Sequence, residues 1–513
     1  MTGSADCPLP TRRRLGTALG AMILTRSGPS RAGTLTPADV GAHGDGVTND
    51  TEALQRLFDR AQAGGLEVRL TPGTYLVSRY LLVRRGLRSI VGGGGVIRCA
   101  PGGLNTGLLL AGPSFGDFAP VENCRIEGVE IDASGREGVV NAIFAANARR
   151  CRFIANRITG MRNGTGILVH GYTAGGSPVE DVTVEDNEIE GITGEHGVAW
   201  WGIRATAELA LPEGIDNQDV MWRRNFRAAD VALPTQRCTI ARNKVRGGYY
   251  GICLLGARNC SVTGNLLRDN VRNITLQDHS RSNTVRLNQC LESQSSSIHL
   301  AFGASDNLVQ DNRIETARAQ GEALLQAYLG VERNRFVGNK VRSSGMPKYL
   351  AYCAIHAIDN SFEGNHLRGR ASRAIAGLES AWDSSFDHPA HHARAAGVVI
   401  RDIARRDSAG NAFSGQVIEA ESAVPALYLG QIGPPATALR GTRLLNNQVR
   451  PSAKERYLEL VEQSPSALTG IEAAGNGFPP SAGPAQFALA RGSAHFARHS
   501  GNGALDDLIG SRP

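Results

Sequence analysis

Short strand-like runs in the middle of the chain carry side chains that could neutralise a carboxylate and move a proton. The runs share an Ile with a second apolar residue two positions later, as in GILVHG, GICLLG, NITLQD and SIHLAF. Because successive side chains of a strand alternate between its faces, the neighbours of an inward Ile point outward. The alignment predicts one outward polar patch, made of His170, Arg204, Tyr250, Asn273, Thr275, Gln277 and His299, with Asp278 and His279 at a strand end. The same alignment places Leu325 and Ala327 on the outward rows.

This patch favours chemistry on a uronate, a sugar that carries a carboxylate. A lyase or an epimerase must neutralise that carboxylate, remove the proton beside it and supply an acid. Arg204 is the candidate cation, His299 or His279 the candidate base, and Tyr250 the candidate acid, with His170 in the same cluster. The sequence therefore favours a lyase or an epimerase acting on a uronate-containing polysaccharide.

Two other functions use the same surface differently. A glycoside hydrolase needs two carboxylates flanking the scissile bond, and the candidates are Glu195, Asp278, Asp383 and Asp387. A non-catalytic polysaccharide-binding protein needs only aromatic and neutral polar side chains. Tryptophan can stack on the apolar C–H faces of sugars or anchor a loop, and the four tryptophans are Trp200, Trp201, Trp222 and Trp382. An enzyme, unlike a binding protein, must bring base, acid and cation into one groove.

One loop-like segment has side chains that suit a divalent metal. The run DHPAHH contains Asp387, His388, His391 and His392. Such a cluster is either a metal site or a polar loop. The chain has no CxxC pair and no zinc-type spacing, so the sequence leaves the cofactor open.

A six-residue motif recurs along the chain and predicts a coiled repeat fold. The segment CSVTGN, Cys260 to Asn265, has relatives in CRFIAN, CTIARN, NTVRLN, NLVQDN, NRFVGN and NSFEGN. The final Asn falls at positions 243, 265, 288, 312, 339 and 365, so the steps are 22, 23, 24, 27 and 26 residues. Periods of this length with short strands in each unit are typical of solenoids. We expect a parallel β-helix with about ten coils.

The repeated Asn and Cys residues are interpreted as structural. An Asn at the same corner of each coil can bond to its copies above and below, and so satisfy backbone groups that a tight corner would leave unpaired. Cys151, Cys238 and Cys260 occupy the first position of the motif, and Cys124 fits the same place. We expect stacked, buried thiols there rather than disulfides or metal ligands.

Segments on either side of the repeats complete the predicted rod. Asn49 and Glu52 resemble a capping box at the start of a helix that would cover the open end of the stack. The apolar face of this helix would contain Ala53, Leu54, Leu57, Phe58 and Ala61. The predicted organisation is an export signal at 1–32, a cap with the first coils at 33–100, a β-helix at 101–450 with insertions near 192–236 and 366–410, and a peripheral tail at 451–513.

The N-terminus is predicted to direct export. Adjacent arginines, Arg12 to Arg14, precede a weakly apolar segment and a small-residue cleavage site at Ser30 to Ala32. This order resembles a twin-arginine signal, which predicts the twin-arginine export machinery as a partner and a periplasmic or secreted location. The net charge of +7, without basic runs interleaved with aromatics, argues against nucleic-acid binding. No stretch reaches the roughly 20 apolar residues of a membrane span.

The segment GDGVTNDTEALQ, followed by PGTYLV, resembles the N-terminal signature of the pectate-lyase-like superfamily. With the N-terminal arginines and the repeats from Cys238 to Asn339, the chain resembles a family of twin-arginine-exported β-helix repeat proteins. The resemblance implies a single-stranded, right-handed parallel β-helix, a fold that serves lyases, glycoside hydrolases, uronate epimerases and phage tailspikes. The DD, NTD and RIK motifs of polygalacturonases and the DPH motif of alginate epimerases are absent. Function must therefore be argued from the site.

Overall fold

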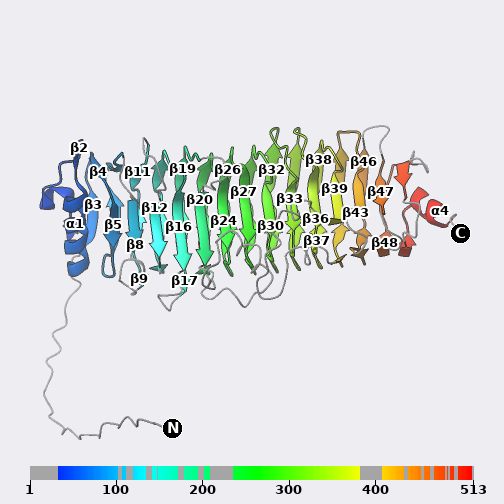
Figure 1. Ribbon diagram of the computed structural model, residues 1–513, viewed down its shortest axis with the longest axis horizontal. Helices are drawn as coiled ribbons and strands as arrows, with labels where there is room; N and C mark the ends of the chain where they lie inside the picture. The colour runs from blue at the N-terminus through cyan, green and yellow to red at the C-terminus, as the bar shows by residue number, and fades with distance from the viewer. Residues whose placement is uncertain are drawn as a thin grey trace, which may run out of the picture.

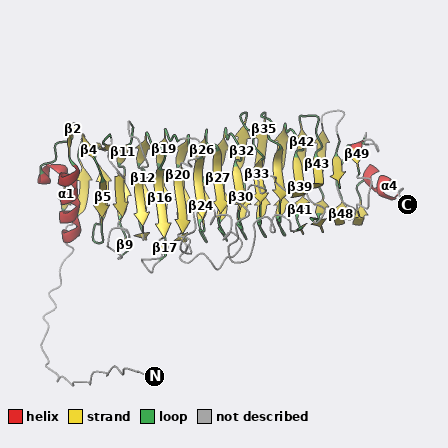
Figure 2. Cartoon of the chain, in the orientation of Figure 1, coloured by secondary structure: helices red, strands yellow, loops and turns green. Residues whose placement is uncertain are grey.

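The chain forms a long rod of stacked coils, shown by the computed structural model in Figure 1. The structure describes residues 33–101, 107–110, 120–134, 141–146, 148–171, 178–194, 201–207, 235–381, 407–432, 437–451, 456–462, 467–479, 482, 486–489 and 495–510. Most of the regular structure in these ranges is β-strand, and the helices described there lie at the two ends of the rod (Figure 2). The predicted right-handed parallel β-helix is confirmed.

Most coils contribute one strand to each of three long parallel sheets, here called sheets A, B and C. In a central coil these strands are β25 (Ser261–Thr263), β26 (Leu266–Arg268) and β27 (Arg272–Gln277). The coils that contain β40 (Ser408–Ala409) and β44 (Leu439–Arg440) contribute two strands to sheet A. Among the described residues, sheet A has 18 strands and sheets B and C have 14 each. The rod therefore has more coils than the ten or so expected, because coils with degenerate motifs at both ends also join the stack.

Sheet C carries the candidate site and runs the length of the rod. Its strands in chain order are β5 (Tyr80–Val83), β8 (Gly107–Leu110), β12 (Asn141–Ala146), β16 (Thr165–Gly171), β20 (Trp201–Ala207), β24 (Tyr250–Leu255), β27, β30 (Ile298–Ala301), β33 (Ala323–Tyr328), β36 (Tyr349–Ala354), β39 (Ala376–Ala381), β43 (Leu427–Ile432), β47 (Leu458–Val461) and β49 (Phe487–Ala488). Neighbouring strands of this sheet pair in parallel.

The core is built from apolar side chains stacked in register between coils. Ile252 pairs with Ile274, and Ile274 pairs with Ile298. All three side chains are fully buried. The predicted inward column is therefore confirmed, and burial of such columns is the main favourable term that holds the coils together.

The recurring Asn residues form continuous ladders of buried hydrogen bonds, as predicted. Asn265 Nδ2 donates to Asn288 Oδ1 at 2.9 Å, and Asn243 Nδ2 donates to Asn265 Oδ1 at 3.0 Å. The first position of the motif forms a second ladder, in which Asn283 Nδ2 donates to Asn307 Oδ1 at 3.0 Å. Earlier coils have buried, free cysteines at that position, Cys238 and Cys260 among them. The expected stacked thiols are therefore present.

A helix covers the N-terminal end of the rod, but it starts differently from the prediction. Helix α1 (Thr51–Gly64) follows the 3₁₀ turn η1 (Pro37–Val40) and strand β2 (Asp45–Asn49). The five predicted apolar residues of α1 are buried. The N-cap is Asp50, whose carboxylate accepts hydrogen bonds from the His43 and Gly44 amides instead of from the helix. Asn49 Oδ1 accepts from the Thr51 amide at 3.0 Å, so the capping box between Asn49 and Glu52 was a wrong prediction.

The C-terminal residues continue the rod, so the expected peripheral tail was also wrong. Strands β47 and β48 (Leu468–Ala474) join sheets C and A, and helix α4 (Ala504–Gly510) lies at the C-terminal end (Figure 1). Asn502 is the last rung of the longer ladder and donates through Nδ2 to Asp506 Oδ1 of α4 at 2.8 Å. Since each rung donates toward the C-terminus, a carboxylate that only accepts suits the final position. No helix in the described ranges is long and apolar enough to span a bilayer.

The predicted insertion ranges contain strands of the rod. Strand β20 lies within 192–236, and β38 (His366–Gly369) and β39 lie within 366–410. Asn187 donates directly to Asn243 Oδ1 at 2.8 Å, so one coil spans this interval of 56 residues. Residues 208–234 and 382–406, which make up most of the two predicted insertions, lie outside the described residues.

Candidate functional site

The outward face of sheet C brings several predicted site residues into neighbouring strands. Arg204 of β20 pairs in register with Cys253, Cys253 with Thr275, and Thr275 with His299. This part of the outward row has the predicted register. Beyond His299 the alignment was shifted by one residue, because Leu325 pairs with the inward Ile298. The outward positions therefore belong to Gln326 and Tyr328 rather than to Leu325 and Ala327.

Asn273 faces the interior rather than the patch. Its Oδ1 accepts a hydrogen bond from Asn270 Nδ2 at 2.9 Å, and the residue is fully buried. In the preceding coil the equivalent residue is Gly251, and a Cβ there would lie 2.6 Å from Leu267 in the core. On the N-terminal side of the inward Ile, the outward position is two residues before the Ile rather than one. Arg272 and Tyr250 occupy this position in neighbouring strands and pair in register.

Arg272 links the candidate base and the candidate acid, although the sequence prediction missed it. Its Nη1 lies 3.2 Å from His299 Nδ1, and its Cζ lies 5.9 Å from the centre of the Tyr250 ring. A guanidinium only donates hydrogen bonds, so His299 Nδ1 accepts and the ring proton resides on Nε2. Aligning Arg272 with Tyr250, two residues before the inward Ile, could have identified it from the sequence.

The environment sets different protonation states for the groups around Arg272. Burial, and then the charge of Arg272, holds the pKa of His299 well below its ordinary value, so the imidazole is neutral. Burial raises the pKa of Tyr250 to about 12, so the phenol keeps its proton. Burial also raises the pKa of Asp278 to about 7, although the charge of Arg204 opposes this shift. A neutral imidazole, a neutral phenol and a carboxyl that titrates near neutrality suit acid–base chemistry.

Arg204 and Trp201 form the N-terminal part of the patch. The Arg204 guanidinium lies 4.4 Å from the centre of the Trp201 ring, and that ring stacks on Tyr250 with centroids 6.3 Å apart. His170, on β16, is half-buried, and its ring meets Phe144 edge-on at 6.4 Å. Burial, and then the charge of Arg204, lowers the pKa of His170 to about 3. At neutral pH the positive charge of this part of the patch thus comes from arginine rather than from histidine.

Thr275, Gln277, Asp278 and His279 are buried although they lie on or beside the outward face. Thr275 Oγ1 and Asp278 Oδ1 have no hydrogen-bond partner among the described residues. Asp278 and His279 both adopt positive φ values, 54° and 59°, and so do Ile355 and His356 three coils further along. Their backbone conformation is therefore a turn that recurs in the rod, whereas the Asp278 carboxyl is particular to this coil.

Nine predicted site residues have no described position. They lie outside the described residues and are Glu195, Trp200, Trp222, Trp382, Asp383, Asp387, His388, His391 and His392. Within the described ranges, no group of three or more His, Cys, Asp or Glu side chains could hold a metal ion.

A second polar cluster on the same face was not predicted. Glu379 is buried and accepts hydrogen bonds from Tyr349 Oη at 2.5 Å and from Tyr352 Oη at 2.6 Å. Burial raises the pKa of Glu379, against the hydrogen bonds of the two tyrosines, which lower it. Extending the aligned rows past β33 could have shown that Tyr352 and Glu379 face outward.

Comparison with known families and structures agrees with this architecture. Residues 38–252 match the family model described as rhamnogalacturonase A/epimerase, pectate lyase-like. Residues 214–388 match the model described as periplasmic copper-binding protein (NosD). Within the described residues, no group of three or more His, Cys, Asp or Glu side chains could hold a copper ion. Both matches support the pectate-lyase-like superfamily of parallel β-helices.

Several solved structures share the fold at low sequence identity. The A-module of mannuronan C-5 epimerase AlgE6 from Azotobacter vinelandii is 15% identical, covers 91% of this chain and 98% of its own, and superimposes with a TM-score of 0.51. A double mutant of the tailspike protein of E. coli bacteriophage HK620 is 12% identical, covers 83% of this chain and 78% of its own, and superimposes with a TM-score of 0.54. A mutant of that tailspike in complex with a pentasaccharide is 11% identical, with the same coverage and a TM-score of 0.52. These similarities establish the fold.

Proposed function

We propose that this protein binds an acidic, uronate-containing polysaccharide on the outward face of sheet C and removes the proton beside a carboxylate, as a lyase or an epimerase. The observation that carries the proposal is Arg272, whose guanidinium contacts His299 Nδ1 and lies close to the Tyr250 ring. A cation, a neutral imidazole and a neutral phenol are thus within the reach of one side chain. Proton abstraction beside a carboxylate requires these three roles.

The contact between Arg272 and His299 assigns an order to the proposed steps. While Arg272 donates to His299 Nδ1, the lone pair of that nitrogen is occupied and the imidazole cannot act as a base there. A substrate carboxylate held by Arg204 and Arg272 would draw Arg272 away and free the lone pair. His299 would then take the proton from C5 of the uronate.

The fate of the electron pair distinguishes the two reactions. In a lyase, the C4–O4 bond breaks, a C4=C5 double bond forms, and Tyr250 protonates the leaving oxygen. In an epimerase, Tyr250 returns a proton to C5 from the opposite face. The charge of Asp278 reaches Tyr250, and with a pKa of about 7 this carboxyl could restore the proton of Tyr250 after turnover.

Hydrolysis receives less support from the described carboxyls. Among the described residues, the two buried carboxyls of the face are Asp278, directly after β27, and Glu379, on β39. They are separated by four strand steps, or about 19 Å at roughly 4.8 Å per step. The carboxyl pairs of glycoside hydrolases lie at most about 9.5 Å apart.

The comparisons support a polysaccharide as the ligand. The match to the rhamnogalacturonase A/epimerase model ends at residue 252, and so covers Arg204 and Tyr250 but not His299. The NosD model is described as periplasmic. We therefore also propose a periplasmic or secreted location, reached through the twin-arginine machinery that the N-terminal arginines predict.

The test follows both reactions at once. The protein is incubated in D₂O with polygalacturonate, alginate and neutral dextran, and unsaturated uronate is followed by absorbance while deuterium at C5 is followed by NMR. His299→Gln and Arg272→Met should lose at least about a hundredfold in rate, which is typical when an acid–base group is removed. Arg246→Ala is the matched control, since this side chain is 63% exposed and belongs to β23 (Lys244–Arg246) of sheet B.

Each result bears on the proposal. Unsaturated product that disappears in His299→Gln supports a lyase, and deuterium incorporation without cleavage supports an epimerase. Equal activity of His299→Gln, Arg272→Met and wild type would overturn the assignment of this patch. Binding of a uronate polymer without either signal would leave a non-catalytic binding protein, and new reducing ends without unsaturation would indicate a hydrolase.

A further inference from the structure

The outward row of sheet C continues well past the proposed active site. From His299 it runs through Gln326, Tyr352, Gly377 and Tyr428 to Glu459. These residues pair in register over five strand steps, or about 24 Å at roughly 4.8 Å per step. Any elongated ligand on the row at His299 that follows the rod axis would reach the C-terminal part of the same face.

This C-terminal part has a rigid aromatic floor. The rings of Tyr349 and Tyr352 stack with centroids 4.4 Å apart and 6° between their planes. Both hydroxyls bond to the buried Glu379. Gly377 leaves room for this stack, because a Cβ there would lie 2.7 Å from Tyr349 Cε1. Tyr428 packs beside Tyr349, with centroids 6.5 Å apart.

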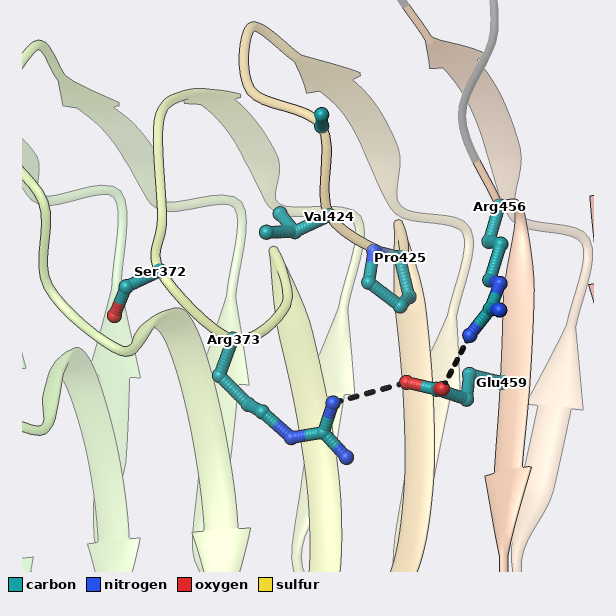
Figure 3. A pocket seen from close by; sticks show the side chains of 7 residues that line it. Ser372, Arg373, Val424, Pro425, Arg456 and Glu459 are labelled. Atoms are coloured by element: carbon teal, nitrogen blue, oxygen red, sulfur yellow. Dashed lines mark hydrogen bonds and ion pairs between the residues drawn. The ribbon is translucent and has the colours of Figure 1, made fainter.

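Two arginines meet one carboxylate in a pocket beside this floor (Figure 3). The pocket has a volume of about 360 Å³ and is lined by Ser372, Arg373, Ala423, Val424, Pro425, Arg456 and Glu459. Arg373 lies over the Tyr428 ring at 3.9 Å and pairs with Glu459 at 3.0 Å. Arg456 pairs with the other oxygen of Glu459 at 2.7 Å. Figure 3 shows both guanidinium groups pointing toward this carboxylate from opposite sides.

The charges and exposures of the pocket suit an anionic group. Two guanidinium groups share one carboxylate, so the lining carries a net positive charge. The Glu459 side chain is 12% exposed, whereas that of Arg456 is 54% exposed and keeps further N–H groups available to a ligand. Arg373 is held by its contact with Tyr428, which lowers the entropy cost of binding. Planar guanidinium groups match carboxylates geometrically.

We propose that this Arg373–Arg456 pocket is a remote subsite that binds a carboxylate of the same acidic polysaccharide. The inference rests on the proposed function, since it takes its ligand class from the site around Arg272. A uronate polymer carries carboxylates at intervals along its length. One chain lying along the rod axis can therefore occupy the site at His299 and the pocket together. The pocket would select long polymers and fix their position.

The experiment measures affinity against oligomer length by calorimetry. The probes are size-fractionated polygalacturonate and alginate oligomers with extended lengths below and above about 24 Å, with dextran oligomers as neutral controls. Wild type should bind the longer acidic oligomers at least about tenfold more tightly than the shorter ones, because the second contact is intramolecular. Arg456→Ala should abolish this gain and leave the affinity for short oligomers unchanged. Arg373→Lys keeps the charge but loses the planar contact with Tyr428, and should reduce the gain in part.

Arg450→Ala is the matched control. This arginine is 64% exposed and pairs with Glu419, but it lies on β46 (Gln448–Pro451) of sheet B. Arg450→Ala should keep the full gain in affinity with oligomer length. Thermal unfolding should confirm that each variant is folded.

The outcomes separate this inference from the proposed function. If Arg204→Ala weakens binding of short oligomers while Arg456→Ala matches wild type at every length, the proposed function stands and the subsite is refuted. If Arg456→Ala loses the gain in affinity for long oligomers and Arg204→Ala does not weaken binding of short ones, the pocket is supported and the site around Arg272 is refuted. Failure of both acidic oligomer series to bind wild type would overturn both.

Discussion

Removing one rung of the longer ladder should uncouple neighbouring coils. The buried Asn265 accepts hydrogen bonds through Oδ1 from the Asn243 amide at 2.9 Å and from Asn243 Nδ2 at 3.0 Å. Its Nδ2 donates to the Ile240 carbonyl at 3.0 Å and to Asn288 Oδ1 at 2.9 Å. Its Nδ2 also donates to the Thr263 carbonyl at 3.3 Å. Asn265→Ala removes all five contacts, while the backbone amide of residue 265 can still donate to Asn288 Oδ1.

The expected cost follows from the group left without a partner. The Asn243 amide loses its hydrogen bond in a buried corner, whereas Asn243 Nδ2 keeps its bond to the Val184 carbonyl. The Ile240 carbonyl keeps a partner, because the parallel register of Ile240 with Val262 leaves it the ladder bond from the Thr263 amide. An unsatisfied buried polar group costs about 1–3 kcal/mol. The Asn243 amide alone therefore accounts for about 2 kcal/mol. At about 1.4 kcal/mol per factor of ten, local opening should become roughly thirtyfold more frequent.

Amide hydrogen exchange measured on peptides is the suitable assay, because a repeat protein opens locally. Peptides that contain residues 238–246 should lose about thirtyfold in protection, with smaller losses several coils away. Ser261→Ala, in β25 of the same coil, is the control, since its side chain is only half-buried. A loss below about tenfold in Asn265→Ala, or an equal loss in the control, would refute the assignment of the ladder as a main source of local stability.

Three further predictions test the rod end, the titration of the site and the aromatic floor. Asp506→Asn places a hydrogen-bond donor against Asn502 and should destabilise the C-terminal end of the rod by about 1–3 kcal/mol. Amide hydrogen exchange should become faster in residues 468–479, while residues 238–246 stay protected. The raised pKa of Asp278 means that its folded form holds a proton up to about pH 7, so its contribution to stability falls as the pH rises from about 4 to 7. Asp278→Asn should remove this loss, together with any inflection near pH 7 in the pH–rate profile, and an unchanged profile would disprove the shift. Gly377→Ala should press a methyl group against Tyr349 and lower stability by about 1–3 kcal/mol, measured as a lower thermal midpoint, and unaltered melting would contradict the tight packing.

The fold could be predicted because its determinants repeat in the sequence. Asn243, Asn265 and Asn288 recur one coil apart, and each makes the same buried hydrogen bonds to the next. The inward Ile residues recur with the same period, so the in-register parallel stack follows from local pattern. The prediction was wrong where the pattern fades, in the number of coils, in the residues after 451 and in the start of α1.

The candidate site depended on tertiary structure at particular positions. Arg204, Thr275 and His299 were aligned correctly because each adjoins a repeated Ile. Arg272 and Asn273 were aligned wrongly, because the side chains at the start of β27 do not alternate simply between the two faces. Only the hydrogen bond between Asn273 and Asn270 shows that Asn273 faces inward and Arg272 outward.

By itself, the sequence determined the parallel β-helix, its Asn ladders and buried thiols, and the face on which polar side chains gather. The tertiary structure alone decided that Arg272 contacts His299, that burial separates the pKa values of His299, Tyr250 and Asp278, and that two arginines meet Glu459 further along that face. The physical reason is that a stacking pattern is periodic and local. Protonation states and ion pairs depend on burial and on distances between side chains from different coils, which no period in the sequence encodes.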